Sequence, residues 1–167
     1  MTALVPILMG SRSDLKQAQA VADALANFGI ASEIRVASAH KTPAYLLKII
    51  EQYEADPRPK VYVTIAGRSN ALSGMVDTQV SAPVIACPPL SDAFGGADIY
   101  SSLRMPSGVA PAVILDPEGA ALFAAKVFAL EDQAIRERVA AFQKQIAERV
   151  LADDAELNRE STRQFGM

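Results

Sequence analysis

Short apolar runs alternate with amphipathic stretches along this chain, and that alternation constrains the fold more than any other feature. Runs rich in β-branched residues favour strands, whereas apolar residues at three- and four-residue spacing favour helices. Five runs are predicted to form strands: Ala3–Met9, Ser32–Ala37, Val61–Ala66, Pro83–Ala86 and Ala110–Leu115. Because strands that alternate with helices form βαβ units, we expect an α/β fold with a parallel sheet.

Typical helix-start and helix-stop residues separate the first strands. Ser13 can cap the first helix, which we expect to end at Gly29. Pro43 occupies the favoured first position of the second helix. These residues therefore predict helices between the first, second and third strands.

The C-terminal part has helical spacing of apolar residues from Pro117 to about Asp153, with a break predicted at Glu131 and Asp132. The residues that follow are polar and are predicted to form a loosely held tail. A chain of 167 residues, of which 50% are hydrophobic, is long enough for one domain with a sizeable core. We therefore expect a single α/β domain at residues 1–153 and a tail at residues 154–167.

Charge and cysteine content exclude several functional classes. A net charge of -3 and a pI near 5.2 give no basic field for a phosphate backbone, so no nucleic-acid partner is expected. Cys87 is the sole cysteine, which excludes an intrachain disulfide and fits a reducing compartment. The N-terminal apolar run lacks the features of a signal peptide, so we expect a cytoplasmic protein without membrane contact.

Loops that follow strands are the places to search for a site, because ligands bind outside the carboxyl ends of parallel strands. After the first strand, Gly10, Ser11, Ser13 and Asp14 combine glycine, hydroxyl groups and a helix start, which suits an anion such as phosphate. The alternative is an ordinary serine-capped helix start, and the two roles can coexist. The loop matches neither the dinucleotide nor the triphosphate motif.

The loop after the second strand contains the only histidine, His40, between Ser38 and Lys41. A histidine can transfer one proton near neutral pH, and a lysine can pair with a phosphate. The pair suits chemistry on a phosphorylated small molecule, although a lone histidine is more often only a polar residue. Zinc would need more nitrogen or sulfur ligands than one histidine and one cysteine supply.

Later loops contain further candidate residues. Gly67 opens a polar segment where the backbone could approach a flat ring closely, although a capped turn is an equal alternative. Cys87 is interpreted as a small apolar filler rather than a nucleophile. Arg104 lies in a polar turn and could instead form a surface ion pair.

Three motifs together resemble the PurE family: Met9-Gly-Ser-Arg-Ser-Asp14, Ser38-Ala-His-Lys-Thr-Pro43 and Met105-Pro-Ser-Gly108. The resemblance runs from about Leu4 to Leu130. Within that family, Gly67-Arg-Ser-Asn70, Cys87-Pro-Pro89 and Ser101–Gly108 resemble the class II branch, the aminoimidazole ribonucleotide (AIR) carboxylases. Class I mutases have a longer Gly-Gly-Ala-Ala-His-Leu-Pro-Gly loop, and this chain has no histidine between Gly67 and Gly74.

The resemblance implies a flavodoxin-like three-layer αβα sandwich with extended C-terminal helices, assembled as a homo-octamer whose active sites lie between subunits. It implies a lyase of purine biosynthesis that reversibly carboxylates C4 of AIR with CO2 to give 4-carboxy-5-aminoimidazole ribonucleotide (CAIR). AIR and CO2 would be its small-molecule partners. No cofactor, ATP, biotin or metal is expected.

The resemblance also assigns roles to individual residues. Ser11, Ser13 and Lys41 would hold the phosphate, Asp14 would accept hydrogen bonds from the ribose, and His40 would be the general acid and base. The Gly67–Asn70 segment would line the pocket for the base and CO2, and Arg104–Gly108 would complete the site. The predicted binding residues are Gly10, Ser11, Ser13, Asp14, Ser38, Lys41, Gly67, Arg68, Ser69, Asn70, Arg104, Met105, Pro106, Ser107 and Gly108.

Three alternative functions remain open. A class I mutase would move a carboxyl group that is already attached to the exocyclic nitrogen of the ribonucleotide. A non-catalytic nucleotide-binding module could share the fold, because a fold does not determine a function. A flavodoxin-type electron carrier is disfavoured, because the chain has no tryptophan and only 6% aromatic residues to stack on a flavin.

Overall fold

The computed structural model describes residues 2–165 and contains one parallel sheet of five strands. The strand order is β2-β1-β3-β4-β5, which is the flavodoxin-like order. The strands are β1 (Leu4–Met9), β2 (Ala31–Val36), β3 (Tyr62–Ile65), β4 (Val84–Ala86) and β5 (Ala112–Val113). All five predicted strands are present, and the predicted α/β fold is confirmed.

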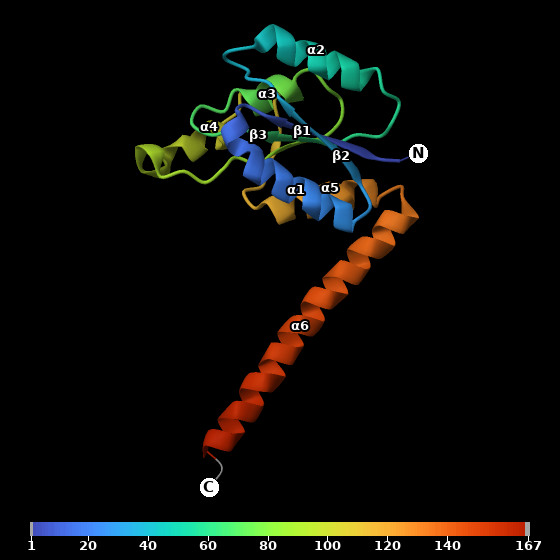
Figure 1. The fold of residues 1–167 in the computed structure, drawn as a ribbon, viewed down its shortest axis with the longest axis vertical. Coiled ribbons are helices and arrows are strands. Elements are labelled where there is room, and N and C mark those ends of the chain that lie inside the picture. The colour runs from blue at the N-terminus through green and yellow to red at the C-terminus, as the bar shows by residue number, and fades with distance from the viewer. Residues whose placement is uncertain (1, 166–167) are drawn as a thin grey trace.

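Helices cover both faces of the sheet. In Figure 1, α2 and α3 lie on one side of the strands, α1 and α5 lie on the other, and α6 projects away from the layers. The main helices are α1 (Leu15–Asn27), α2 (Pro43–Glu54), α3 (Leu72–Asp77), α5 (Pro117–Phe128) and α6 (Gln133–Phe165). Shorter helical segments are η1 (Arg12–Asp14), η2 (Ala93–Ile99) and α4 (Tyr100–Leu103).

The interior strand β1 is fully buried because it contributes to two cores. Val5 and Ile7 pack in the core beneath α1 and α5, whereas Leu4 and Leu8 pack in the core beneath α2. Successive side chains of a strand point to opposite faces, so one apolar run supplies both layers. Strand β2 lies at the sheet edge and is partly exposed.

The N-terminal part of α6 is anchored on the end of α1. The Arg138 guanidinium donates a hydrogen bond to the Phe28 carbonyl oxygen at 2.8 Å. The Phe28 and Phe142 rings pack edge to face, with their centroids 5.4 Å apart. Gly29 follows with a φ of 69°, which is the left-handed conformation that glycine adopts readily at a helix end. A Cβ at Gly29 would also collide with the Arg138 guanidinium.

The C-terminal helix is longer than the sequence pattern predicts. The helix was expected to end near Asp153, but α6 continues to Phe165. Residues 154–165 contain neither glycine nor proline, so nothing in their composition stops a helix. Exposed apolar side chains continue along it, with Val150 at 62%, Leu151 at 69% and Leu157 at 63% exposure.

Within residues 2–165, none of the helices combines the length and the hydrophobicity that crossing a bilayer requires.

Candidate active site

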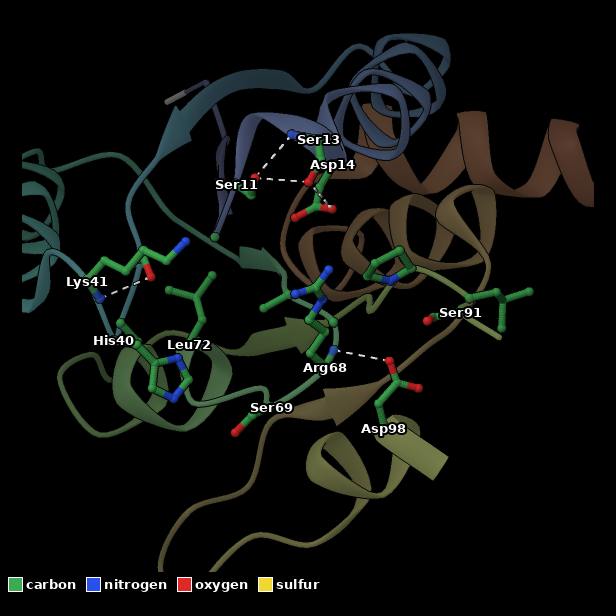
Figure 2. Close-up of a pocket in the computed structure, with 17 residues that line it drawn as sticks. Ser11, Ser13, Asp14, His40, Lys41, Arg68, Ser69, Leu72, Ser91 and Asp98 are labelled. Atoms are coloured by element: carbon green, nitrogen blue, oxygen red, sulfur yellow. Dashed lines mark hydrogen bonds between the residues drawn. The ribbon is translucent and has the colours of Figure 1, made fainter. Parts of the chain in front are cut away.

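A cleft of about 760 Å³ opens at the carboxyl ends of the strands. Strands β1 and β3 are neighbours there although the chain leaves β1 towards β2, which makes this gap the switch point where ligands bind in such sheets. Loops after β1, β2, β3 and β4 all contribute to the lining (Figure 2). Ten of the predicted binding residues and the predicted base, His40, lie in these loops. His40 and nine of the ten line the cleft, and Asn70 does not.

The loop after β1 places two serines at the start of a helix. Ser11 caps η1, since its Oγ accepts a hydrogen bond from the Ser13 N–H at 3.3 Å. The Ser13 hydroxyl lies 2.9 Å from the Ser11 Oγ and 3.2 Å from Asp14 Oδ1. Gly10 connects this loop to the neighbouring strand, because its N–H donates to the Ile65 carbonyl oxygen at 2.9 Å. The capping role is therefore present, and exposed hydroxyls still face the cleft.

The loop after β2 forms a tight turn around Ser38. The Ser38 Oγ accepts a hydrogen bond from the Lys41 N–H at 3.2 Å, and the Ser38 N–H donates to the Thr42 Oγ1 at 3.0 Å. This turn places the exposed side chains of His40 and Lys41 at the cleft. The turn therefore brings a cation and an imidazole from adjacent positions to the cleft, opposite the Ser11–Ser13 loop.

The loop after β3 brings Gly67, Arg68 and Ser69 to the cleft. A Cβ on Gly67 would lie 3.2 Å from the Pro89 Cγ, so glycine allows the loops after β3 and β4 to pack closely. Arg68 adopts a φ of 56°, which is an uncommon conformation for a residue with a side chain. Its N–H donates to Asp98 Oδ2 at 3.2 Å (Figure 2).

Asn70 is not part of the cleft lining, although it belongs to the predicted pocket segment. Its side chain is only 5% exposed and turns into the protein interior. There its amide nitrogen donates to the Ser73 Oγ at 2.8 Å and to the Ser102 Oγ at 2.9 Å. A buried amide that makes these bonds is in contact with protein rather than with the cleft.

The predicted segment Arg104–Gly108 also lies outside the cleft lining of this chain. It connects α4 to β5 and packs near α3: Met105 Sδ lies 3.3 Å from the position that a Cβ on Gly74 would occupy. Beyond it, the Ala110 N–H donates to Asp77 Oδ2 at 2.8 Å. One chain therefore does not bring these residues to the cleft that the Ser11–Ser13 and His40–Lys41 loops line.

Seven residues that line the cleft were not predicted: Ala39, Ala66, Leu72, Pro89, Leu90, Ser91 and Asp98. Pro89, Leu90 and Ser91 lie in the loop after β4, so their position beyond the carboxyl end of a strand was a usable signal. Asp98 gave no such signal. It reaches the cleft because η2 contains a sharp turn in which Phe94, Gly95 and Gly96 all have positive φ.

Cys87 is buried at the end of β4, and the Gln17 amide nitrogen lies 3.4 Å from its Sγ. Burial raises the pKa of the Cys87 thiol, which disfavours the nucleophilic thiolate. Among the described residues, no three His, Cys, Asp or Glu side chains cluster in a way that could hold a metal ion.

Several proteins similar to this chain are named as phosphoribosylaminoimidazole carboxylases. A family model described as AIR carboxylase matches residues 4–149. Phosphoribosylaminoimidazole carboxylase of Treponema denticola is 53% identical over 159 residues, which cover 95% of this chain and 100% of the relative. The enzyme of the same name from Archaeoglobus fulgidus is 56% identical over 151 residues, which cover 90% of this chain and 83% of the relative.

The structural comparison agrees with the sequence comparison. The crystal structure of Treponema denticola PurE matches with a TM-score of 0.92 and 53% identity, over 93% of this chain and 98% of that one. This chain belongs to the AIR carboxylase family, whose members include the PurE enzymes.

Proposed function

We propose that this chain is an enzyme of purine biosynthesis that carboxylates C4 of AIR with CO2 to give CAIR. The single observation that supports this function best is the cleft itself, where His40 and Lys41 lie opposite the Ser11–Ser13 loop in a member of the AIR carboxylase family. A proton-transfer group and an anion-binding loop share one cavity. This is the combination that a reaction on a phosphorylated heterocycle requires.

The serine loop and Lys41 form the phosphate site in this proposal. Ser11 and Ser13 present exposed hydroxyls at the start of α1, where backbone N–H groups and the helix dipole favour an anion. Lys41 adds a positive charge from the neighbouring loop. Asp14, beside them, accepts hydrogen bonds from the ribose hydroxyls. These contacts fix the nucleotide and leave its base facing the histidine loop.

The chemistry then follows from the electronics of the base. The 5-amino group donates electron density into the imidazole ring, and C4 attacks the carbon of CO2 to form the new carbon–carbon bond. One C–O π bond becomes the carboxylate lone pair. C4 still carries its hydrogen, and His40 removes that proton so that the ring regains aromaticity. In reverse, protonated His40 returns the proton to C4 and CO2 leaves.

The protein supplies position and electrostatic stabilisation. Holding CO2 against C4 removes much of the entropic cost of the reaction, and a placed base contributes about a hundredfold or more. CO2 is uncharged, so little binds it before reaction. The Ser69 hydroxyl and the Ser69 backbone N–H group would stabilise the carboxylate as it forms.

The class II reaction is the form that we propose: reversible, independent of ATP and biotin, and without a metal or other cofactor. The electron-rich C4 of AIR supports this proposal, because it can attack CO2 without prior activation. The segment after β3 also lacks the histidine-containing loop of the class I mutases. The carboxylase would use CO2 directly, whereas a mutase would use an N-carboxy compound. Assays with the two substrates therefore distinguish the two reactions.

We also propose that the enzyme is a cytoplasmic homo-octamer with active sites between subunits. Two features support assembly: the exposed apolar side chains of α6, and the Arg104–Gly108 segment, which lies away from the cleft of its own chain. Exposed apolar side chains along a helix are typical of an interaction surface, and a partner that buries them stabilises the assembly. A neighbouring subunit could then supply Arg104 to the site.

The experiment supplies purified enzyme with AIR and dissolved CO2 in the absence of ATP, and follows the ultraviolet absorbance of CAIR. We expect product at a rate that rises with the concentration of dissolved CO2. A parallel assay supplies the N-carboxy compound. Activity on that compound alone would replace the carboxylase with a mutase, and silence on both would contradict the proposed function.

A further inference from the structure

The cleft loop after β3 contains a strained residue. Arg68 has a φ of 56° and is not a glycine, so its conformation costs energy that neighbouring contacts must offset. Such strain persists where the surrounding structure holds the residue in place. The contacts of the Gly67–Asn70 segment show which residues hold it.

The segment at residues 98–101 holds the strained peptide from the cleft side. The Arg68 N–H donates to Asp98 Oδ2 at 3.2 Å. The Ser101 Oγ lies 3.1 Å from the Arg68 carbonyl oxygen and 2.7 Å from the Asp98 carbonyl oxygen. The same Oγ accepts a hydrogen bond from the Asn70 N–H at 2.9 Å. One hydroxyl therefore connects both ends of the Arg68–Asn70 turn to the segment after β4.

A buried network holds the segment from the interior. Asn70 Oδ1 accepts the Ser73 N–H at 3.1 Å, which fixes the start of α3, while its amide nitrogen reaches Ser102 and Ser73. The Thr64 Oγ1 lies 2.8 Å from the Ser73 Oγ, which extends the network to β3. Thr64 and Ser73 are completely buried. A fully paired buried network specifies one arrangement, because each broken bond leaves a polar group unsatisfied.

We infer that Asp98, Ser101 and Asn70 are positioning residues, which hold Arg68 and Ser69 at the cleft in the one conformation that serves the carbon–carbon bond-forming step. This inference rests on the proposed function, because it assigns the Gly67–Ser69 loop to the base and CO2. The phosphate site lies on other loops, after β1 and β2. Loosening the segment therefore lowers kcat while nucleotide binding is retained.

Ser101 offers a matched pair of variants. Ser101→Ala removes the connecting hydroxyl, whereas Ser101→Thr keeps it. We expect Ser101→Ala to lower kcat roughly tenfold to a hundredfold, as a displaced catalytic group does, with the dissociation constant for AIR near that of the wild type. Ser101→Thr should restore most of the rate. Asn27→Ala, an exposed change at the far end of α1, controls for unspecific effects.

Asp98 provides a second pair that separates positioning from direct contact with substrate. Asp98→Asn keeps an oxygen that can accept the Arg68 N–H, and Asp98→Ala removes it. We expect Asp98→Asn to retain most of kcat and Asp98→Ala to lose it. Equal losses in both variants would mean that the charge itself acts on the substrate, which would overturn the positioning role of Asp98.

Amide hydrogen exchange tests the same inference without turnover. The N–H groups of Arg68 and Asn70 should exchange faster in Ser101→Ala than in the wild type and in Asn27→Ala. Unchanged exchange would overturn the inference even if AIR is carboxylated. A wild-type enzyme that does not carboxylate AIR would overturn the proposed function instead, and the exchange data would still show whether Ser101 holds the loop. Parallel losses of kcat, AIR affinity and thermal stability in Ser101→Ala would indicate a merely structural role.

Discussion

His40 and Asn70 illustrate what a residue's type and position in the sequence do and do not predict. His40 lies in the short turn after strand β2. The strand prediction alone therefore places it at the carboxyl edge of the sheet. Asn70 has a similar position after β3, but its side chain points inward. Its side chain bonds both the nearby Ser73 and Ser102, and the contact with Ser102, which is distant in sequence, could not be predicted from a local pattern.

A substitution at His40 tests its proposed role in proton transfer. His40→Asn keeps a polar side chain of similar size but cannot transfer a proton, so we expect kcat to fall by about a hundredfold or more. AIR binding should be retained, because the proposed phosphate and ribose contacts come from other residues. Steady-state kinetics and calorimetric titration with AIR measure the two effects. Wild-type turnover in His40→Asn would remove the histidine from the mechanism.

The strands of the sheet and the positions of its loops can be predicted from the sequence, whereas the packing of one loop against another cannot. Five apolar runs predicted the strands, and the parallel order then placed four loops at one edge. The sharp turn in η2 has no regular periodicity, so the approach of Asp98 to Arg68 became visible only in the structure. The polar composition after Asp153 does not predict the length of α6, because polar residues such as glutamate, arginine and glutamine are themselves good helix formers.

A carboxyl in the turn between α2 and β3 is expected to make the stability of the fold depend on pH. The Arg58 guanidinium lies 2.6 Å from Asp56 Oδ2, and its hydrogen bonds lower the pKa of the Asp56 carboxyl from 3.8 to about 2. A carboxyl with a depressed folded-state pKa stabilises the fold above its unfolded pKa, and this contribution is lost as pH falls through the folded value. Asp56→Asn should therefore be less stable than the wild type near neutral pH.

Denaturant unfolding at several pH values measures the effect of Asp56. The difference between wild type and Asp56→Asn should shrink as pH falls from 3.8 towards 2. Because the pair is at the surface, added salt should shrink it too. A difference that stays constant over this pH window would show that Asp56 acts through something other than its charge.

The whole molecule combines a compact three-layer body with a helix that extends beyond it (Figure 1). Burial inside the body accounts for Ile135 and Val139, which lie near the start of α6. It does not account for Val150 and Leu157, which are exposed in one chain. The proposed octamer would account for them, since a neighbouring subunit could cover this part of the helix.

A charge substitution on α6 tests that assembly. In the double variant with Val150→Glu and Leu157→Glu, we expect a lower molar mass by light scattering than in the wild type, because buried carboxylates disfavour an apolar interface. The control with Gln143→Glu and Gln145→Glu adds the same charge to exposed polar positions of the same helix. An unchanged mass in both variants would show that α6 does not form the interface.

The proposed reaction joins free CO2 to C4 of AIR in the cleft. The most direct measurement incubates the enzyme with AIR and isotopically labelled CO2, without ATP, and locates the label in the product by nuclear magnetic resonance. We expect the wild type to form product with the label in a carboxylate bonded to C4, and His40→Asn to form much less of it. Label on the exocyclic nitrogen, or no incorporation of label by the wild type, would contradict the proposed reaction.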